Sequence, residues 1–378
     1  MNKISFNKPY ITGKETEYIV DAVARRHISG NGYYTSKCQQ FFEETWGFRK
    51  CLLTTSCTDA LEMAAMLIDI KPGDEVIIPS YTFVSTALAF VRQGAHIVFA
   101  DSRSDHPGID EDGIGALINS KTKAIVVVHY AGVACDMDKI MELADRHKLW
   151  VIEDAAQAID SYYKGNALGS IGHIGCFSFH ETKNIQCGEG GMLAINHESF
   201  VKRAEILWEK GTNRAEFFRG EINKYGWVDI GSSFLPSDII AAFLWAQIEQ
   251  YADIQQQRLH IWNTYHACLS QNISNEIKLP VIPGYASNNA HMFYLVCSGL
   301  DVRSRLIEHL KINGIQAVFH YLSLHKSEFI IKQKYHLTDL PQSDRLTDCL
   351  LRLPFYYELS DVDIEYICHT ILQFRDSK

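Results

Sequence analysis

The chain has 378 residues, which exceeds the usual size of one hydrophobic core and predicts a large domain with a smaller one. Hydrophobic residues make up 47% and charged residues 21%, and no apolar stretch approaches the roughly 18 residues of a membrane span. The formal net charge of −9 argues against nucleic acid as the main partner but permits a local positive pocket for a phosphorylated ligand. We therefore expect a soluble protein with neither a membrane nor a nucleic acid as partner.

The N-terminus, the cysteines and the histidines predict a reducing, cytoplasmic setting without metal. Residues 1–15 contain no apolar core of signal-peptide length, and Pro9 and Gly13 interrupt them early. The ten cysteines have no C-x-x-C spacing and lie mostly in apolar runs, so we expect buried thiols rather than disulfides or a zinc site. The histidines show no H-x-x-H pair, and we expect no metal site.

From about residue 50 to residue 200, short apolar runs alternate with segments of helical periodicity. The expected strands are KCLLTT, EVIIPS, HIVFADS, KAIVVVHYAG and WVIEDAA, and the expected helices are DALEMAAMLIDI, TALAFVRQG and DKIMELADRHK. This alternation is typical of an α/β fold with a largely parallel central sheet. Such sheets bind ligands at the carboxyl ends of their strands, so the polar residues after each run are the candidates for a site.

The remaining segments predict the edge of this sheet and a second domain. CFSFH and GGMLAIN predict two further strands, with ETKNIQCGE as a loop between them. Residues 236–269 have apolar spacings of three and four, which predict one or two long helices linking the domains. HMFYLVCS, RSRLIEHLKINGI and AVFHYL predict a small α+β domain. We expect a large ligand-binding domain over residues 1–250 and a small domain over residues 251–378.

Lys183 lies in the predicted loop between the last two strands, just before the glycines of GEGG. An amine in a partly desolvated pocket loses its charge more readily and can form a Schiff base with an aldehyde. An isolated lysine is far more often a surface residue. The neighbouring residues favour a ligand site.

Asp154 ends the strand in WVIEDAA, at the edge of the sheet where ligands bind. A carboxylate there can hold the protonated ring nitrogen of a pyridoxal cofactor, which makes the ring a stronger electron sink. The alternative is an aspartate that caps a helix. Strand alternation predicts that Glu153 points to the other face.

Small polar residues and one aromatic residue follow two other strands. Ser56, Cys57 and Thr58 begin a helix whose N–H groups and dipole would favour a phosphate. Simple capping by Ser56 or Thr58 explains them equally well. Ser178 could add a hydroxyl group to the same phosphate. Phe83 follows EVIIPS, where it could stack on a cofactor ring or belong to the core.

Other chemistries find less support in the sequence. GEGG does not match the G-x-G-x-x-G nucleotide fingerprint, and no segment resembles a P-loop. Ser56 and Cys57 have no neighbouring base in the sequence, so nothing favours nucleophilic hydrolysis.

These motifs, in this order, resemble the DegT/DnrJ/EryC1/StrS sugar aminotransferases, which are fold-type I pyridoxal-phosphate enzymes. The resemblance spans nearly the whole chain and rests on FNKPYITGKE, TSCTDALEMA, PSYTFVST, VHYAG, EDAAQA, CFSFHETKNIQCGEGG and HYLSLH. It implies pyridoxal 5′-phosphate as the cofactor and a homodimer in which each subunit completes the active site of the other.

The resemblance also implies residue roles. Lys183 would carry the cofactor as a Schiff base and shuttle the proton during the transfer, and Asp154 would hold the ring nitrogen. The other implied cofactor contacts are Phe83 stacked on the ring, Gln157 beside it, and Cys57, Thr58 and Ser178 at the phosphate.

One position departs from the family pattern. Many members have G-Y-N-Y-R-M where this chain has GSSFLP, so Ser233 replaces an asparagine that reaches the cofactor phosphate of the partner subunit. A serine side chain is shorter, which leaves open whether this cross-subunit contact is kept.

KGTNRAEFFRG, KYGWVDIGSSFLPSD and NNAHMFYLV resemble the branch that makes dTDP-4-amino-4,6-dideoxygalactose for enterobacterial common antigen. That branch implies amination of dTDP-4-keto-6-deoxyglucose at C4 with L-glutamate as the amino donor. His320, Tyr321 and His325 match family positions near the nucleotide-sugar, so they are the expected substrate-binding residues. The alternative is that these three residues lie on the ordinary surface of the small domain.

Three rival functions share the fold. The first rival is an enzyme that acts on a 3-keto or a UDP-linked sugar. The sequence does not distinguish it from a 4-keto sugar enzyme, because few polar contacts hold the sugar. A sugar dehydratase of the family has a histidine in place of the lysine, so Lys183 argues against that activity. A non-catalytic regulatory relative would be expected to lack the lysine or the aspartate, and both are present.

Overall fold

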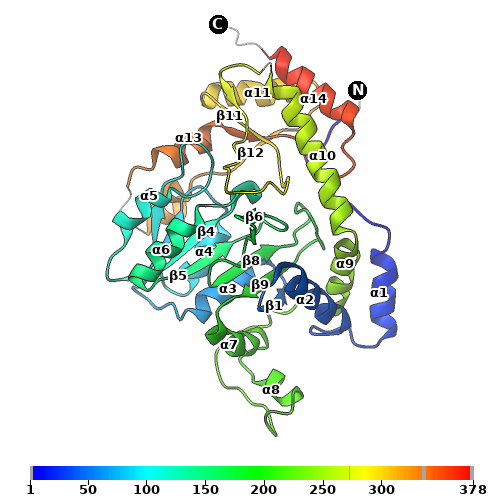
Figure 1. Cartoon of the computed structure of the whole chain (residues 1–378), viewed down its shortest axis with the longest axis vertical. Helices are drawn as coiled ribbons and strands as arrows, with labels where there is room; N and C mark the ends of the chain where they lie inside the picture. The colour runs from blue at the N-terminus through cyan, green and yellow to red at the C-terminus, as the bar shows by residue number, and fades with distance from the viewer. Residues whose placement is uncertain (1–2, 272, 334–337, 375–378) are drawn as a thin grey trace.

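The computed structural model describes residues 3–271, 273–333 and 338–374. Two sheets organise these residues (Figure 1). In spatial order the larger sheet consists of β1 (Lys50–Thr54), β9 (Gly191–Ile195), β8 (Ile174–Ser178), β5 (Trp150–Asp154), β4 (Thr122–Val128), β2 (Glu75–Pro79) and β3 (His96–Ala100). The smaller sheet consists of β10 (Ile277–Lys278), β11 (Tyr294–Cys297), β13 (Leu350–Arg352) and β12 (Val318–Phe319). A short hairpin joins β6 (Tyr162–Tyr163) and β7 (Asn166–Ala167).

The larger sheet is mostly parallel. Only β9 runs against its neighbours, β1 and β8, whereas the pairs from β8 to β3 are parallel. Parallel sheets need helical cover on both faces, which is why their strands read as nearly continuous apolar runs. The predicted α/β fold with a largely parallel sheet is confirmed.

Helices cover both faces of this sheet. One hydrophobic core contains residues of α2 (Tyr33–Trp46), α6 (Met137–His147) and α9 (Asp238–Glu249). The core on the other face contains residues of α3 (Cys57–Leu67), α4 (Ser85–Arg92) and α7 (Glu198–Trp208). Along β2, Ile77 packs into the first core while Val76 and Ile78 pack into the second, as strand alternation requires.

The other helices lie around these layers and over the smaller sheet. They are α1 (Glu15–Ala24), α5 (Glu111–Ile114), α8 (Arg214–Phe218), α10 (Tyr251–Ser270), α11 (Leu300–Ile312), α12 (Glu328–Lys332), α13 (Pro341–Cys349) and α14 (Asp361–Gln373). Short 3₁₀ turns occur at Gly115–Leu117, Tyr130–Gly132 and Leu324–Lys326. None of the helices in the described ranges combines the length and the apolar character that crossing a bilayer requires.

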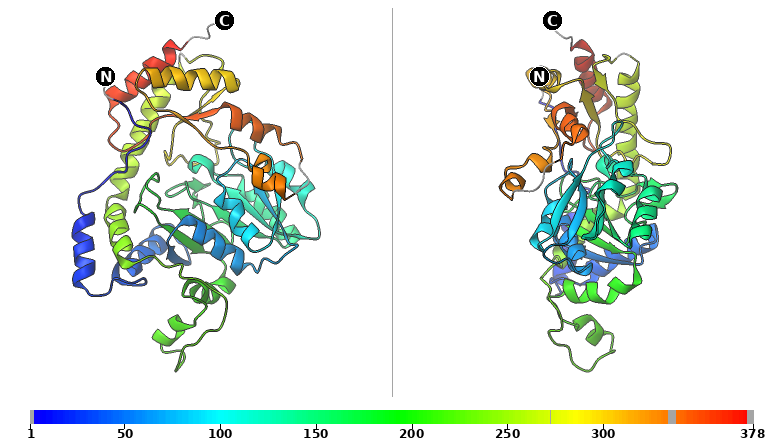
Figure 2. Two further views of the ribbon diagram at one scale, coloured as in Figure 1. Left: turned by 180° about the vertical axis from the view of Figure 1, so that it is seen from behind. Right: turned by 90° about the vertical axis from the view of Figure 1, so that its left-hand side faces the viewer.

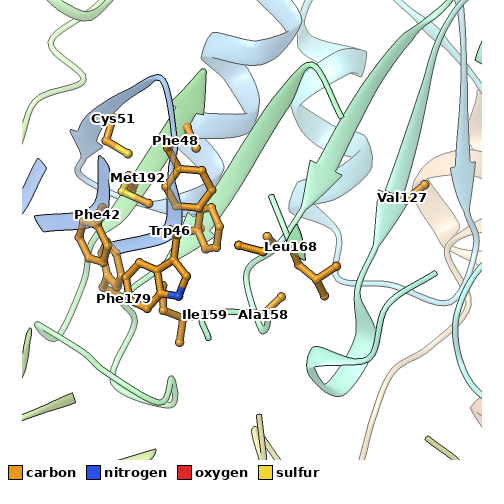
Figure 3. Close-up of a cluster of buried hydrophobic side chains, with 14 of the residues drawn as sticks. Phe42, Trp46, Phe48, Cys51, Val127, Ala158, Ile159, Leu168, Phe179 and Met192 are labelled. Atoms are coloured by element: carbon orange, nitrogen blue, oxygen red, sulfur yellow. The ribbon is translucent and has the colours of Figure 1, made fainter. Parts of the chain in front are cut away.

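Stacked aromatic rings anchor the loop that follows β8. The ring of Phe42 stacks on Trp46 at 5.6 Å and on Phe179 at 5.3 Å between centroids. Figure 3 shows these three side chains within one buried cluster. Because Phe179 is the first residue after β8, this packing fixes the start of the loop that carries Lys183.

The segment 236–269 forms two helices, α9 and α10, as predicted, and they meet at Gln250. From that point α10 runs alongside the smaller sheet (Figures 1 and 2). The N-terminal strand residue Ile4 pairs with Ile315 and is buried in the same core as Ile261 of α10. The division of the chain at residues 250 and 251 stays a prediction, and Ile4 packs with the C-terminal part.

Residues 209–235, which we call the α8 extension, leave the core at the end of α7 and return to it at Phe234, and the part around α8 projects away from both sheets (Figures 1 and 2). Large apolar side chains lie exposed there, with 67% of Phe218 and 84% of Trp227 accessible to solvent. A surface of this kind commonly marks an interaction site.

Candidate active site

The carboxyl ends of β4, β5 and β8 open into a cavity of about 430 Å³. The last residues of these strands, Val128, Asp154 and Ser178, all line the cavity. The other walls include Ser56, Cys57 and Thr58 at the start of α3, Thr82, Phe83 and Ser85 after β2, Lys183 after β8, and His320, Tyr321 and Arg352 beside the smaller sheet. The cavity therefore lies where the strand-end rule for α/β sheets predicts a ligand site.

Asp154 is buried, with 6% of its surface exposed. Its Oδ2 accepts a hydrogen bond from Thr86 Oγ1 at 2.7 Å, and its Oδ1 accepts one from Ala156 N at 3.2 Å. Burial raises the pKa of the carboxyl group, and both hydrogen bonds oppose the shift because they favour the charged form. A turn rather than a helix follows Asp154, so the helix-cap alternative is wrong.

Glu153 does not line this cavity. Its carboxylate accepts hydrogen bonds from the backbone N–H groups of Gly169, Ile171 and Gly172 and lies 2.9 Å from His129 Nε2. Its separate set of partners agrees with the predicted alternation along β5 and shows that Glu153 organises the loop before β8.

Lys183 lies in a tight loop between β8 and β9. Backbone hydrogen bonds join Phe179 N to Gly190 O at 2.8 Å and Lys183 N to His180 O at 2.9 Å. Burial lowers the pKa of the Lys183 amine from 10.5 to about 8, and the positive charge of Arg352 acts in the same direction. With a pKa of about 8, about a tenth of the amine is neutral at pH 7, which makes Lys183 a usable nucleophile and base.

The start of α3 forms another wall. The Ser56 hydroxyl accepts the backbone N–H three residues later at 3.1 Å, so Ser56 is the helix cap and lines the cavity as well. Thr58 Oγ1 donates to Ser85 Oγ at 2.8 Å. A Cβ atom added to Gly191 of β9 would lie 2.5 Å from Cys57 N. Only glycine permits this close approach, which leaves the helix N-terminus free of covering side chains from β9.

Gln157, Tyr321 and Phe83 are adjacent in the cavity. Gln157 Oε1 accepts a hydrogen bond from Ala131 N at 2.6 Å, and its Nε2 donates to the Tyr321 hydroxyl at 3.4 Å. The Phe83 ring lies 5.9 Å from that of Tyr321, and 55% of its surface is exposed. Phe83 is therefore not a core residue, and its ring is available to a ligand.

His320 and Arg352 face the cavity from the side of the smaller sheet. His320 Nδ1 lies 3.0 Å from the Tyr130 hydroxyl, and Arg352 Nη1 lies 3.5 Å from His320 Nε2. Burial lowers the pKa of His320, and the positive charges of Arg352 and Lys183 lower it further. The imidazole is therefore neutral at physiological pH.

Two predicted site residues lie away from the cavity. His325 is buried, with its Nδ1 2.7 Å from Ser80 Oγ and its Nε2 3.6 Å from Asp344 Oδ1. It joins the segment after β12 to the end of β2, and the expected contact of His325 with the substrate stays a prediction. Ser233 is exposed on the α8 extension, where it pairs with Glu209. The expected contact of Ser233 with a partner subunit stays a prediction.

Several lining residues were not predicted from the sequence. The polar ones among them are Thr82, Ser85, His180, Thr182, Glu189 and Arg352. Thr82 and Ser85 flank Phe83 in PSYTFVST, so the rule that ligands gather after strands could have found them. The signal for Arg352 was a single charge inside the apolar run LLRLP.

Solved structures place this fold among the pyridoxal-phosphate-dependent aminotransferases. Spr1654 from Streptococcus pneumoniae, in its PLP form, superposes with a TM-score of 0.89 at 25% identity, covering 98% of this chain and 97% of that one. The aminotransferase TlmJ from Streptoalloteichus hindustanus gives a TM-score of 0.89 at 26% identity, with 98% of each chain covered.

The sequence comparisons show the family. The DegT/DnrJ/EryC1/StrS aminotransferase family matches residues 9–372, and the chain belongs to it. GDP-perosamine synthase of Escherichia coli O157:H7 is 31% identical over 384 residues, with 100% of both chains covered. The protein is a sugar aminotransferase that depends on pyridoxal phosphate.

The residues around the cavity fit this cofactor. Asp154 offers a buried carboxylate to a cation, and the start of α3 offers N–H groups that no side chain of Gly191 covers. Lys183 offers an amine with a lowered pKa in the same cavity. These are the three chemical groups that a phosphorylated pyridine aldehyde requires.

Acylation of the cofactor-free protein tests the environment of Lys183. Because only the neutral amine is nucleophilic, its labelling rate should rise with pH through a midpoint at about pH 8. Peptide mapping by mass spectrometry after labelling at a series of pH values measures that midpoint. Exposed Lys139 serves as an internal control, and a Lys183 midpoint near 10.5 would show that the amine is not desolvated. In Asp154→Asn the midpoint should fall further, because a negative charge that favours the ammonium form is lost.

Proposed function

We propose that this sugar aminotransferase transfers the amino group of L-glutamate to C4 of dTDP-4-keto-6-deoxyglucose and forms dTDP-4-amino-4,6-dideoxygalactose. The observation that supports amino transfer is that Lys183 and Asp154 line one cavity beside the start of α3. The choice of sugar is supported by the segments KGTNRAEFFRG and KYGWVDIGSSFLPSD, which resemble the branch with this product.

The names of two relatives support a nucleotide-sugar substrate and a product that enters a surface polysaccharide. One is GDP-perosamine synthase. The other is the spore coat polysaccharide biosynthesis protein SpsC of Bacillus subtilis strain 168, which is 31% identical over 382 residues, with 97% of this chain and 96% of SpsC covered. We infer that the amino sugar made here is incorporated into a glycan such as enterobacterial common antigen, and that the enzyme acts in the cytoplasm.

The cofactor would be held at several points. Lys183 would bind it covalently, Asp154 would face the ring nitrogen, and Gln157 would lie beside the ring. The further contacts in this proposal are Phe83 against the ring face and Cys57, Thr58 and Ser178 at the phosphate. When bound, pyridoxal phosphate supplies a ring that withdraws electrons from the substrate carbon and stores the amino group between the two halves of the transfer.

The protein's own contribution is proton transfer and charge placement. With the cofactor bound, the neutral amine of Lys183 would take the proton from the α-carbon of the donor. In the second half of the reaction its ammonium form can give a proton to C4 of the sugar. Asp154 must stay ionised to stabilise a positive ring nitrogen, and its hydrogen bonds from Thr86 and Ala156 favour that form despite burial. His320 and Tyr321 would contact the sugar.

The two half-reactions can be followed separately in the purified holoenzyme. L-glutamate should change the absorbance of the bound cofactor, and dTDP-4-keto-6-deoxyglucose should reverse the change while a 4-amino sugar forms. Lys183→Ala should lower the rate by at least about 10²-fold, because general base catalysis typically contributes that much. Lys139→Ala, on the exposed surface, is the matched control and should keep the wild-type rate.

The result with other sugars decides between the proposal and its rival. If glutamate changes the absorbance but only a 3-keto or a UDP-linked sugar reverses it, the amino transfer stands and the assigned sugar is wrong. If glutamate does not change the absorbance, the assignment of L-glutamate as the amino donor is wrong.

We propose further that the enzyme is a homodimer whose subunits complete each other's active sites. Phe83, which lines the cavity, and Val84, the next residue in the chain, are 55% and 49% exposed, and a second subunit would cover them. The same interface would bury the exposed side chain of Trp227 on the α8 extension. In such a dimer Ser233 would approach the cofactor phosphate of the other subunit.

Light scattering should give twice the mass of one chain for the wild type. Trp227→Ser should weaken association and lower the specific activity more at low protein concentration than at high concentration. Val362→Ser is the control, since Val362 is similarly exposed, at 75%, but lies on α14. A wild-type protein with the mass of one chain and full activity would refute the shared site.

A further inference from the structure

Arg352 is the one arginine that lines the active-site cavity among the described residues. It ends β13, a central strand of the smaller sheet, where it lies opposite Tyr294 of β11 and Val318 of β12. Its guanidinium lies 4.8 Å from the centre of the Phe6 ring. The strand and the ring thus fix a cation at the wall of the cavity.

The hydrogen-bonding capacity of Arg352 is mostly unused. A guanidinium has five N–H donors. Within the described residues, Nη1 has a long contact of 3.5 Å to His320 Nε2, while Nε is buried and has no acceptor. No carboxylate in the described part of the chain pairs with it, and its electrostatic neighbours are tyrosines. Arg352 is half-buried, and a partly desolvated cation without a counter-ion favours an anionic ligand.

The groups that face Arg352 do not neutralise it. The phenols of Tyr81, Tyr130 and Tyr321 act on its charge, but burial raises the pKa of each, so all three stay uncharged at physiological pH. His320 is neutral too, and Lys183 adds a further positive charge when protonated. The side of the cavity next to the smaller sheet is therefore electropositive.

The anions already assigned to the cavity lie elsewhere. Asp154 accepts hydrogen bonds from Thr86 and Ala156, and in the proposed function it faces the cofactor ring. Glu189 is largely exposed and lies 3.7 Å from His180. The cofactor phosphate belongs to the start of α3, which is a separate wall from the strand that carries Arg352. Arg352 is thus left to bind an anion that arrives with a substrate.

We propose that Arg352 binds the α-carboxylate of the amino donor. This inference rests on the proposed amino transfer, because it concerns the first substrate of that reaction. In an amino acid the α-carboxylate is attached to the carbon that exchanges its proton with Lys183, so it must lie close to that amine. The planar fork of a guanidinium matches a carboxylate and can hold it with two parallel hydrogen bonds.

The second substrate does not present the same anion at the same place. In a nucleotide-linked 4-keto sugar the reacting C4 carries no charge, and the diphosphate is attached at C1, on the opposite side of the sugar ring. Arg352 would therefore distinguish the two half-reactions. Its loss should impair the amino acid half-reaction and spare the binding of the nucleotide.

Two probes test the holoenzyme with Arg352→Gln and Arg352→Lys. α-Methyl-L-glutamate has the α-carboxylate but no α-hydrogen, so calorimetry can measure its dissociation constant without turnover. γ-Aminobutyrate keeps an amine and a distal carboxylate but lacks the α-carboxylate. Arg352→Gln should raise the dissociation constant of α-methyl-L-glutamate and the Michaelis constant for L-glutamate by about 10- to 100-fold, the loss expected for a charge-assisted hydrogen bond.

The same substitution should leave unchanged both the Michaelis constant for γ-aminobutyrate and the dissociation constant of dTDP. Arg352→Lys should recover part of the loss, because the charge remains without the fork. Arg146→Gln, at an exposed position on α6, is the control for a general loss of positive charge. Cofactor content and melting temperature show whether each variant is folded.

Three outcomes would overturn the assignment of Arg352. They are an equal penalty on glutamate and γ-aminobutyrate, a weakened binding of dTDP with unchanged binding of α-methyl-L-glutamate, and wild-type constants throughout. A wild-type enzyme that accepts no amino group from glutamate would contradict the proposed function instead, and the calorimetric comparison would still decide the role of Arg352.

Discussion

The desolvated amine of Lys183 is the feature on which the rest of the site depends. Its environment is set by tertiary contacts that begin at the next residue. Asn184 Nδ2 donates to Gln255 Oε1 and to Asn289 O, both at 2.9 Å, and Asn184 Oδ1 lies 2.8 Å from His291 Nδ1. These partners belong to α10 and to the segment before β11, so the docking of the two parts of the chain fixes the lysine loop.

Charge is distributed unevenly around this amine. The chain as a whole carries a formal net charge of −9, yet Lys183, Arg352 and the start of α3 make the cavity attractive to anions. Asp154 supplies a single buried negative charge at the end of β5. A phosphorylated cofactor and an amino acid both match this pattern, which connects the fold to its reaction.

The sequence predicted the parts of the site that depend on local order. Asp154 and Ser178 end strands whose apolar runs are plain in the sequence, and parallel strands bring their carboxyl ends to one edge. Arg352 was not predicted, because its place in the cavity depends on packing between segments far apart in the chain. His320 and His325 look equivalent in HYLSLH, but the 3₁₀ turn at Leu324–Lys326 directs His325 toward Ser80.

One measurement decides whether Lys183 is the residue that binds the cofactor. Borohydride reduction of the holoenzyme should fix the cofactor to a single lysine, and mass spectrometry of the digested protein identifies the peptide. The label should lie on Lys183, and Lys183→Ala should carry none. A label on another lysine of the wild type, or an unlabelled wild-type holoenzyme, would contradict this assignment.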